Sequence, residues 1–241
     1  MTTSRQRVQA EAHGHEHRDV SGGWLRPAVF GAMDGLVTNV SLIAGVGGGG
    51  GDRHAIILTG LAGLAAGAFS MAAGEFVSVS SQNELVQSEV SKEQHELETN
   101  AVAEQAELVG MLRARGLSAA TARQAAAEIS VHPDKLLAIH AIEELGVNPA
   151  ELPSPFVAAA ASLAAFTCGA IIPLFPYLFA AHVMWMALAL SAVAAVLGGG
   201  VVARLTARPF WRGALRQLVL GALAAGLTSL IGLAVGGVAG H

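Results

Sequence analysis

Charged residues are scarce in this chain, and cysteine is almost absent. Lys, Arg, Asp and Glu together make up 13% of the 241 residues, about half the share of an ordinary soluble domain. The single cysteine, Cys168, lies in an apolar run, so it can build neither a disulfide framework nor a Cys-x-x-Cys metal site. We interpret it as a packing residue. The mild net charge of −4 gives no sign of nucleic-acid binding.

Aromatic residues are also few, at 5%, whereas hydrophobic residues make up 53% and the mean hydropathy is +0.52. Small side chains such as Gly and Ala let helices pack closely in lipid, where van der Waals contact drives association. No strand pattern appears. The composition therefore predicts an all-α membrane protein surrounded by a lipid bilayer. The polar first 26 residues contain no apolar core of a signal peptide, so we expect the first span to direct insertion itself.

Five stretches are long and apolar enough to cross a bilayer, which takes about 20 residues. The first two each contain one acidic residue, Asp34 and Glu75, and the last three contain no Asp, Glu, Lys or Arg. We expect Pro173 and Pro176 to mark the end of the third. The five stretches are residues 27–46, 54–80, 156–178, 180–203 and 217–239.

The segment between the second and third stretches, residues 81–155 (the insert), has a different character. It holds twelve Asp and Glu residues in a helical pattern. Gly116, Ser118, Pro133 and Gly146 are expected helix ends and starts, and they predict three helices over 83–115, 118–130 and 133–146. We thus predict five transmembrane helices with a three-helix domain inserted between spans 2 and 3. The expected divisions are a tail (1–26), spans 1–2 (27–80), the insert (81–155) and spans 3–5 (156–241).

Basic residues predict the orientation of the chain. The connection between spans four and five is the most basic, Arg18 and Arg26 precede span one, and the glycine-rich connection after span one has only Arg53. Basic loops face the cytoplasm. We therefore expect the N-terminus and the insert on the cytoplasmic side and the C-terminus outside, which agrees with an odd number of spans. The basic connection contains Arg204, Arg208, Arg212 and Arg216.

Four glutamates of the insert share one face of the predicted 83–115 helix. At about 100° per residue they fall within an arc of about 80°, while Glu98 lies on another side. Like charges on one stripe repel one another, and hard divalent cations bound through carboxylate oxygens would compensate. The alternative is a solvated acidic face without a ligand. The four residues are Glu93, Glu96, Glu104 and Glu107.

Histidines supply further candidate ligands. His140 and Glu144 are four residues apart and share a helix face, so together with Glu143 they could complete the coordination; the alternative is an ordinary helix end with a surface histidine. A tract with His13, His15 and His17 could bind metal or be disordered. No Glu-x-x-His pair occurs, which argues against a ferritin-like di-iron oxidase, and we expect no enzymatic activity.

Span one contains Asp34, and a charge within a span is a functional hypothesis by default. Gly31 and Gly35 form a Gly-x-x-x-Gly pattern that allows close approach of another helix. Asn39 adds a polar group further along the span. The alternative for Asp34 is a structural pairing.

Span two contains Met71 and Glu75. A thioether beside an aspartate would favour a borderline transition metal over Mg²⁺ or Ca²⁺, although most such methionines merely pack. Glu75 lies near the end of its span, where it could relay protons or metal ions, or simply sit at the interface. The candidate translocation path therefore comprises Asp34, Asn39, Met71 and Glu75.

Several of these residues stand in runs that resemble the vacuolar iron transporter family, and the resemblance extends from about residue 20 to residue 239. It implies a five-span homodimer that exchanges Fe²⁺, often also Mn²⁺, for protons along a path lined by span one at the dimer interface. The runs are residues 30–37 (FGAMDGLV), 65–82 (AAGAFSMAAGEFVSVSSQ) and 144–146 (ELG).

The resemblance also implies roles for individual residues. The family's translocation Asp and Met match Asp34 and Met71, and Glu75 fits a bacterial-type version of the span-two motif. Where eukaryotic members have methionines beside the last acidic ligand, this chain has His140 and Ala141, so its ligand set differs. The family's acidic ligands match Glu93, Glu96, Glu104, Glu107 and Glu144.

We therefore expect a divalent metal transporter of a bacterial cell membrane that moves ions out of the cytoplasm in exchange for protons. Fe²⁺ or Mn²⁺ is the transported ion, no cofactor is bound permanently, and a homodimer is expected. The alternatives are a membrane-anchored buffering or sensing module without transport, and a structural scaffold. Asp34 and Asn39 favour transport, because neither alternative needs polar groups inside a span.

Overall fold

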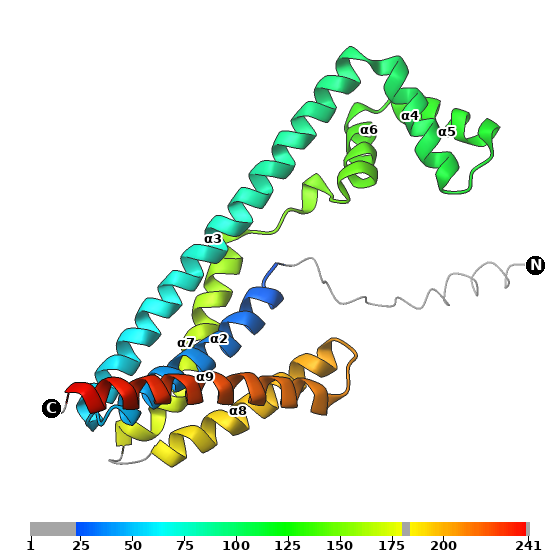
Figure 1. Cartoon of the computed structure of the whole chain (residues 1–241). Coiled ribbons are helices and arrows are strands. Elements are labelled where there is room, and N and C mark those ends of the chain that lie inside the picture. The colour runs from blue at the N-terminus through cyan, green and yellow to red at the C-terminus, as the bar shows by residue number, and fades with distance from the viewer. Residues whose placement is uncertain (1–22, 180–183, 240–241) are drawn as a thin grey trace, which may run out of the picture.

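The computed structural model describes residues 23–179 and 184–239, and every regular element in this part of the chain is helical (Figure 1). The expectation of an all-α protein is confirmed. The tract with His13, His15 and His17 lies outside the described residues. The elements are α2 (Leu25–Gly48), α3 (Arg53–Thr99), α4 (Ala101–Ala114), α5 (Ala119–Ser130), α6 (Pro133–His140), the π-helix η1 (Ala141–Leu145), the 3₁₀-helix η2 (Pro149–Glu151), α7 (Pro155–Phe179), α8 (Met184–Leu205) and α9 (Phe210–Ala239).

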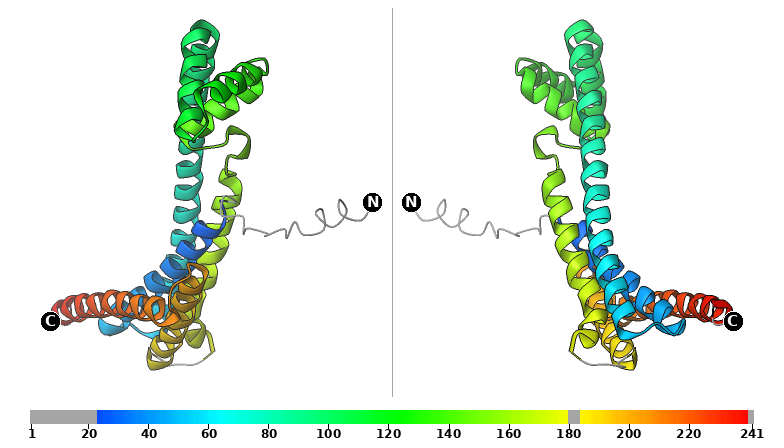
Figure 2. Two further views of the ribbon diagram at one scale, coloured as in Figure 1. Left: turned by 90° about the vertical axis from the view of Figure 1, so that its right-hand side faces the viewer. Right: turned by 90° about the vertical axis from the view of Figure 1, so that its left-hand side faces the viewer.

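Five of these helices are long and apolar enough to cross a membrane, judged by length and composition: α2, α3, α7, α8 and α9. Helix α2 contacts the four others and forms the centre of this bundle. Helix α9 packs against α2 and α8 but has few buried residues and many exposed large apolar side chains, and in Figure 2 its C-terminal end extends away from α3 and α7. An apolar helix of this kind needs lipid or another protein surface around it.

Helices α2 and α7 pack with their backbones close together. A Cβ at Gly35 would overlap the carbonyl group of Phe166, and a Cβ at Gly169 would overlap that of Ala32. Glycine at these positions allows the contact. The partner of the Gly31 and Gly35 pattern is therefore α7 of the same chain.

Helix α3 runs from the bundle into the insert without interruption. Its first turn is capped by the Asp52 side chain, which accepts a hydrogen bond of 2.7 Å from the Ala55 N–H. Its 47 residues give it a length of about 70 Å. The second span and the first helix of the insert are thus one continuous helix.

The prediction of one helix over 83–115 is wrong at Asn100. This residue leaves the helical conformation with φ −125° and ψ 34°, and its carbonyl accepts hydrogen bonds from the N–H groups of Ala103 and Glu104, which start α4. Asparagine competes for backbone hydrogen bonds and favours helix ends. The chain turns sharply here, and α4 leads away from the tip of α3 (Figure 1).

The other predicted helix ends of the insert are confirmed. Gly116 has φ +98° after α4 and Gly146 has φ +69° after the π-helix, a conformation that glycine adopts readily. The Ser118 side chain accepts a hydrogen bond from the Thr121 N–H at the start of α5, and Pro133 is the first residue of α6. Beyond α3, the insert therefore contains α4, α5 and α6.

One span boundary and the role of two prolines differ from the expectation. Pro173 and Pro176 lie inside α7, because neighbouring helices and side chains can satisfy backbone groups that a proline frees in a bundle. From the neighbouring helix α2, the Asn39 Nδ2 donates to the Ala170 carbonyl in the same part of α7. Helix α9 begins at Phe210, so Arg212 and Arg216 belong to the helix rather than to the connection before it.

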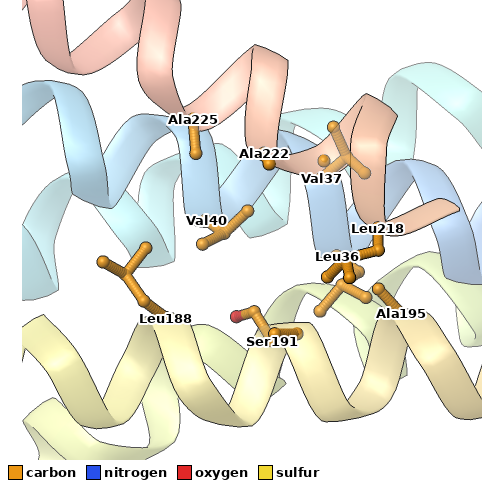
Figure 3. Close-up of a pocket in the computed structure, with 11 residues that line it drawn as sticks. Leu36, Val37, Val40, Leu188, Ser191, Ala195, Leu218, Ala222 and Ala225 are labelled. Atoms are coloured by element: carbon orange, nitrogen blue, oxygen red, sulfur yellow. The ribbon is translucent and has the colours of Figure 1, made fainter. Parts of the chain in front are cut away.

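An apolar cavity of about 220 Å³ lies between α2, α8 and α9. Figure 3 shows Val40, Leu188 and Ala225 pointing into it from the three helices. Its lining is almost wholly aliphatic, and the hydroxyl of Ser191 donates to the Ala187 carbonyl of its own helix. This region of the bundle is therefore loosely packed.

Candidate metal centre

Three side chains from separate helices converge inside the insert. Glu93 of α3, Glu104 of α4 and His140 at the end of α6 are all buried, and His140 is 0% exposed. One ligand atom from each lies within 4.8 Å of the others. The His140 Nδ1 is 2.8 Å from Glu93 Oε1 and 3.8 Å from Glu104 Oε2. We call these three residues the insert cluster; the alternative of a surface histidine is wrong.

The polar atoms of the insert cluster are not satisfied by the protein. Within the described residues, Glu93 Oε1 and both ring nitrogens of His140 are buried without a hydrogen-bond partner. Their close approach is therefore not a well-aligned hydrogen bond. Buried polar atoms are rarely left unpaired, because desolvation without compensation is costly. A cation bound between Glu93 Oε1 and His140 Nδ1 would satisfy these two atoms together.

Electrostatics also favours a cation here. Burial raises the pKa of Glu93 above its ordinary value of 4.5, and the charge of Glu144 raises it further, while His140 opposes the shift. Burial likewise raises the pKa of Glu104, followed by the charge of Glu107. The site thus resists carrying its full negative charge unless a positive charge compensates.

More exposed carboxylates surround the cluster. Glu144 Oε1 lies 3.4 Å from His140 Nδ1, and Glu96 and Glu107 are close enough for their charges to act on the buried glutamates. The structure therefore brings together Glu93, Glu104 and His140 with Glu144 beside them, and it places Glu96 and Glu107 nearby, although the continuous helix used to predict four of these residues does not exist. They gather because the turn at Asn100 places α4 near α3.

The π-helix helps to position Glu144. It follows His140 directly, and the Arg115 guanidinium at the end of α4 donates to the Glu143 carboxylate at 2.9 Å. π-Turns within helices are frequent at functional sites. Glu143 was also a candidate ligand from the sequence. Its carboxylate instead pairs with Arg115 and lies outside the insert cluster. The role of Arg115 was not predicted, since its partner is 28 residues away.

The donor set indicates the kind of ion. Carboxylate oxygens with one imidazole suit Mn²⁺ and Fe²⁺, whereas soft ions such as Cu⁺ prefer sulfur. Glu98, which the helical geometry separated from the stripe, is exposed and accepts a hydrogen bond of 3.0 Å from Gln94. It is outside the cluster, as expected.

The candidate path residues of the bundle are more dispersed. Asp34 is half-buried and accepts a hydrogen bond of 3.4 Å from Thr38 Oγ1. Met71 packs against an apolar cluster around Phe166. Glu75 is buried, and Asn39 is fully buried with an unpaired Oδ1.

Among the described residues, the insert cluster is the only group of three His, Cys, Asp or Glu side chains close enough to share an ion. Asp34 and Glu75 are in no such group. Within the described residues, a single copy of the chain therefore assembles a candidate ion site in the insert but not in the bundle.

Comparison with known proteins shows similarity along nearly the whole chain. Residues 25–233 match the VIT family. The chain is 35% identical over 227 residues to a "Vacuolar iron transporter" of Acanthamoeba castellanii, covering 91% of this chain and 82% of that protein. It is 35% identical over 218 residues to "Vacuolar iron transporter homolog 2" of Arabidopsis thaliana, covering 87% and 85%. A "Vacuolar iron transporter 2" of Oryza sativa is 28% identical over 223 residues, covering 91% and 90%.

Proposed function

Because the chain belongs to the VIT family, we propose that it carries Fe²⁺, and also Mn²⁺, across a membrane in exchange for protons. The observation that supports this proposal most directly is the insert cluster, whose buried atoms converge without partners of their own. The relatives are named as transporters, and no enzymatic activity is proposed.

The insert captures the ion in this proposal. Glu96, Glu107 and Glu144 are exposed and attract a hydrated cation to the cluster. Glu93, Glu104 and His140 then replace part of its water shell. Borderline and hard divalent ions accept such oxygen and nitrogen ligands.

The ion next reaches the bundle along the direction of α3. Glu75 and Glu93 lie on the same face of this helix, about five turns or 27 Å apart. Within the bundle, Asp34 and Met71 take over as ligands, with Asn39 offering its free Oδ1. Asp34 exchanges the ion for a proton, since one carboxylate cannot hold both at once.

The arrangement in the membrane follows from five single crossings. The start of α2, the insert and the connection from α8 to α9 then share one side, and the arginines on that side support assigning it to the cytoplasm. The division into tail (1–26), spans 1–2 (27–80), insert (81–155) and spans 3–5 (156–241) belongs to the same proposal. Ions leave the cytoplasm, and the membrane is a bacterial cell membrane.

We further propose that the path is completed by a second copy of the chain. Asp34 is only half-buried, and many large apolar side chains of α9 are exposed. A homodimer would cover such surfaces and supply further ligands at the interface.

Metal flux into proteoliposomes tests the proposal. Fe²⁺ uptake by the full chain should rise when a pH gradient is imposed, and Asp34→Asn should abolish uptake while leaving metal binding by the insert unchanged. Glu98→Gln is the control and should behave as the wild-type protein does. Undiminished flux in Asp34→Asn would remove the role given to that residue. Metal binding without flux in the wild-type chain would instead favour a buffering or sensing module.

A further inference from the structure

The connection between α8 and α9 is short and rigid. The Arg208 N–H donates to the Ala203 carbonyl at 2.7 Å, and the Ala207 N–H donates to the Arg204 carbonyl at 3.2 Å. These two bonds form the Schellman motif that ends many helices. Pro209 follows at once, and α9 begins at Phe210. The connection therefore has little freedom to rearrange.

Ala207 adopts an unfavourable conformation in this turn. Its φ is +54°, the only positive value at a non-glycine residue among those described. Glycine usually occupies this position of the motif, because a Cβ is strained there. Strained backbone that is held in place is often found at functional sites.

The rigid turn presents positive charge without negative partners. Residues 156–241 contain no Asp or Glu. Four arginines lie on the last turn of α8, on this connection and on the first turns of α9, and all are exposed. Among the described residues, no ion pair involves any of them. We call this set the arginine platform; it comprises Arg204, Arg208, Arg212 and Arg216.

Aromatic rings hold two of these guanidinium groups. Arg204 lies 5.6 Å from the ring centre of Phe210, and Arg212 lies 5.3 Å from that of Trp211. Such contacts stabilise a cation and order its side chain. The stacked guanidinium groups keep their N–H donors free at the ring edges, where an oxyanion can accept them.

Large apolar side chains flank the arginines and are also exposed. Trp211 is 60% exposed and Leu215 is 53% exposed. Tryptophan and arginine at the ends of apolar helices lie at the level of the lipid headgroups. A molecule that binds this surface must therefore carry a negative charge next to a hydrocarbon chain. The acidic side chains of the insert are exposed to water, so they do not meet this requirement.

We propose that the arginine platform binds the phosphate of an anionic phospholipid, with the acyl chains along Trp211 and Leu215. Guanidinium groups bind phosphate oxygens in pairs of parallel hydrogen bonds. Basic residues next to a membrane-crossing helix attract anionic lipid in the same way. This site does not depend on the transport proposal, because it uses none of the residues assigned to metal ions.

Native mass spectrometry of the full chain in detergent tests the site. Dioleoylphosphatidylglycerol should bind more tightly than dioleoylphosphatidylcholine, and each Arg→Gln replacement at Arg208, Arg212 or Arg216 should weaken its binding by about fivefold. Arg123→Gln removes the same charge from an exposed position of α5 and should change nothing. Ala207→Gly relieves the strained turn while keeping every arginine, and it should retain the preference for the anionic lipid.

Three outcomes would overturn the proposal. One is equal binding of the two lipids. Another is unchanged lipid binding after all three arginines have been replaced. The third is inorganic phosphate competing as well as the lipid does, which would indicate a site for a soluble anion. If the triple variant fails to fold, the three single variants give the same comparison.

Discussion

The insert and the membrane bundle hold their acidic residues in opposite ways. In the insert, helices from three parts of the chain bring Glu93, Glu104 and His140 within 4.8 Å of one another. In the bundle, Asp34 and Glu75 stand singly, each on its own helix. A single copy of the chain thus completes a candidate site in the insert and leaves the candidate path open.

This difference matches the cost of charge in the two surroundings. Water reaches the rim of the insert, where Glu96 and Glu107 are exposed, so an acidic site there can exist without its ion. An unpaired cluster of carboxylates inside a bilayer would be far more costly. We infer that a bundle site assembles only when the ion and a second copy arrive.

The largest expected effect is the loss of metal affinity when the insert cluster loses one of its ligands. Glu104→Gln keeps the shape of the side chain but removes its charge, and it should weaken Mn²⁺ binding by on the order of a hundredfold, since losing a ligand should cost at least as much as losing an outer partner. Glu98→Gln is the matched control on the exposed side of α3. Titration calorimetry of the full chain measures both, and equal affinities would contradict the assignment of the cluster.

A second prediction concerns the packing of the bundle. Gly35→Ala forces a Cβ against the backbone of α7 at Phe166, and overpacking of this kind destabilises by about 1–3 kcal/mol. Gly226→Ala is the control, because nothing lies within 4 Å of a Cβ there. Unfolding in detergent should show a loss of stability for the first variant alone, while Mn²⁺ binding by the insert persists in both.

A third prediction concerns how the stability of the insert depends on pH. The folded metal-free insert holds protons on Glu93 and Glu104 above the ordinary pKa of 4.5, because burial raises both pKa values. The unfolded chain binds fewer protons in this range, so the free energy of unfolding falls as pH rises above about 4.5. Hydrogen exchange of α4 to α6 with a chelator present measures the slope.

Replacing both glutamates by glutamine should flatten this pH dependence. Bound Mn²⁺ should also counteract it, because an ion and protons compete for the same oxygens. A slope of the same size in the double variant would assign the pH dependence to other groups.

The smallest expected effect lies at the apolar cavity shown in Figure 3. Gly221 borders it, and a Cβ there would meet only Val37 Cγ2, at 3.8 Å. Gly221→Ala should therefore raise the free energy of unfolding by about 0.5–1 kcal/mol through helix propensity and better filling of the cavity. A loss of stability comparable to that of Gly35→Ala would show that this space is needed.

The sequence predicted which residues gather in the insert more accurately than it predicted their geometry. Glu93 and Glu96, and likewise Glu104 and Glu107, are three residues apart, so each pair shares a face of its own helix. On one straight helix the two pairs would share a stripe but lie about 16 Å apart along the axis, whereas the turn at Asn100 brings Glu93 and Glu104 together. Periodicity alone cannot distinguish these two arrangements, because both keep each pair on one face of its helix.

Other features depend on tertiary contacts and could not be predicted from local patterns. Pro173 reads as a helix end, but α7 continues through it within a packed bundle. Arg115 shows no sequence signal for its partner Glu143, which lies beyond two further helices. By contrast, Gly116, Ser118 and Gly146 act locally, and the structure confirms each of them.

Helix α3 connects the two regions as one continuous rod. Because Glu93 lies about 27 Å along it from Glu75, a tilt of about 10° at the level of Glu75 would displace Glu93 by about 5 Å. Such a displacement exceeds the 2.8 Å between His140 Nδ1 and Glu93 Oε1. Unless α6 moves together with α3, a rocking motion of the second span would move Glu93 out of the insert cluster. Such a motion would release a bound ion.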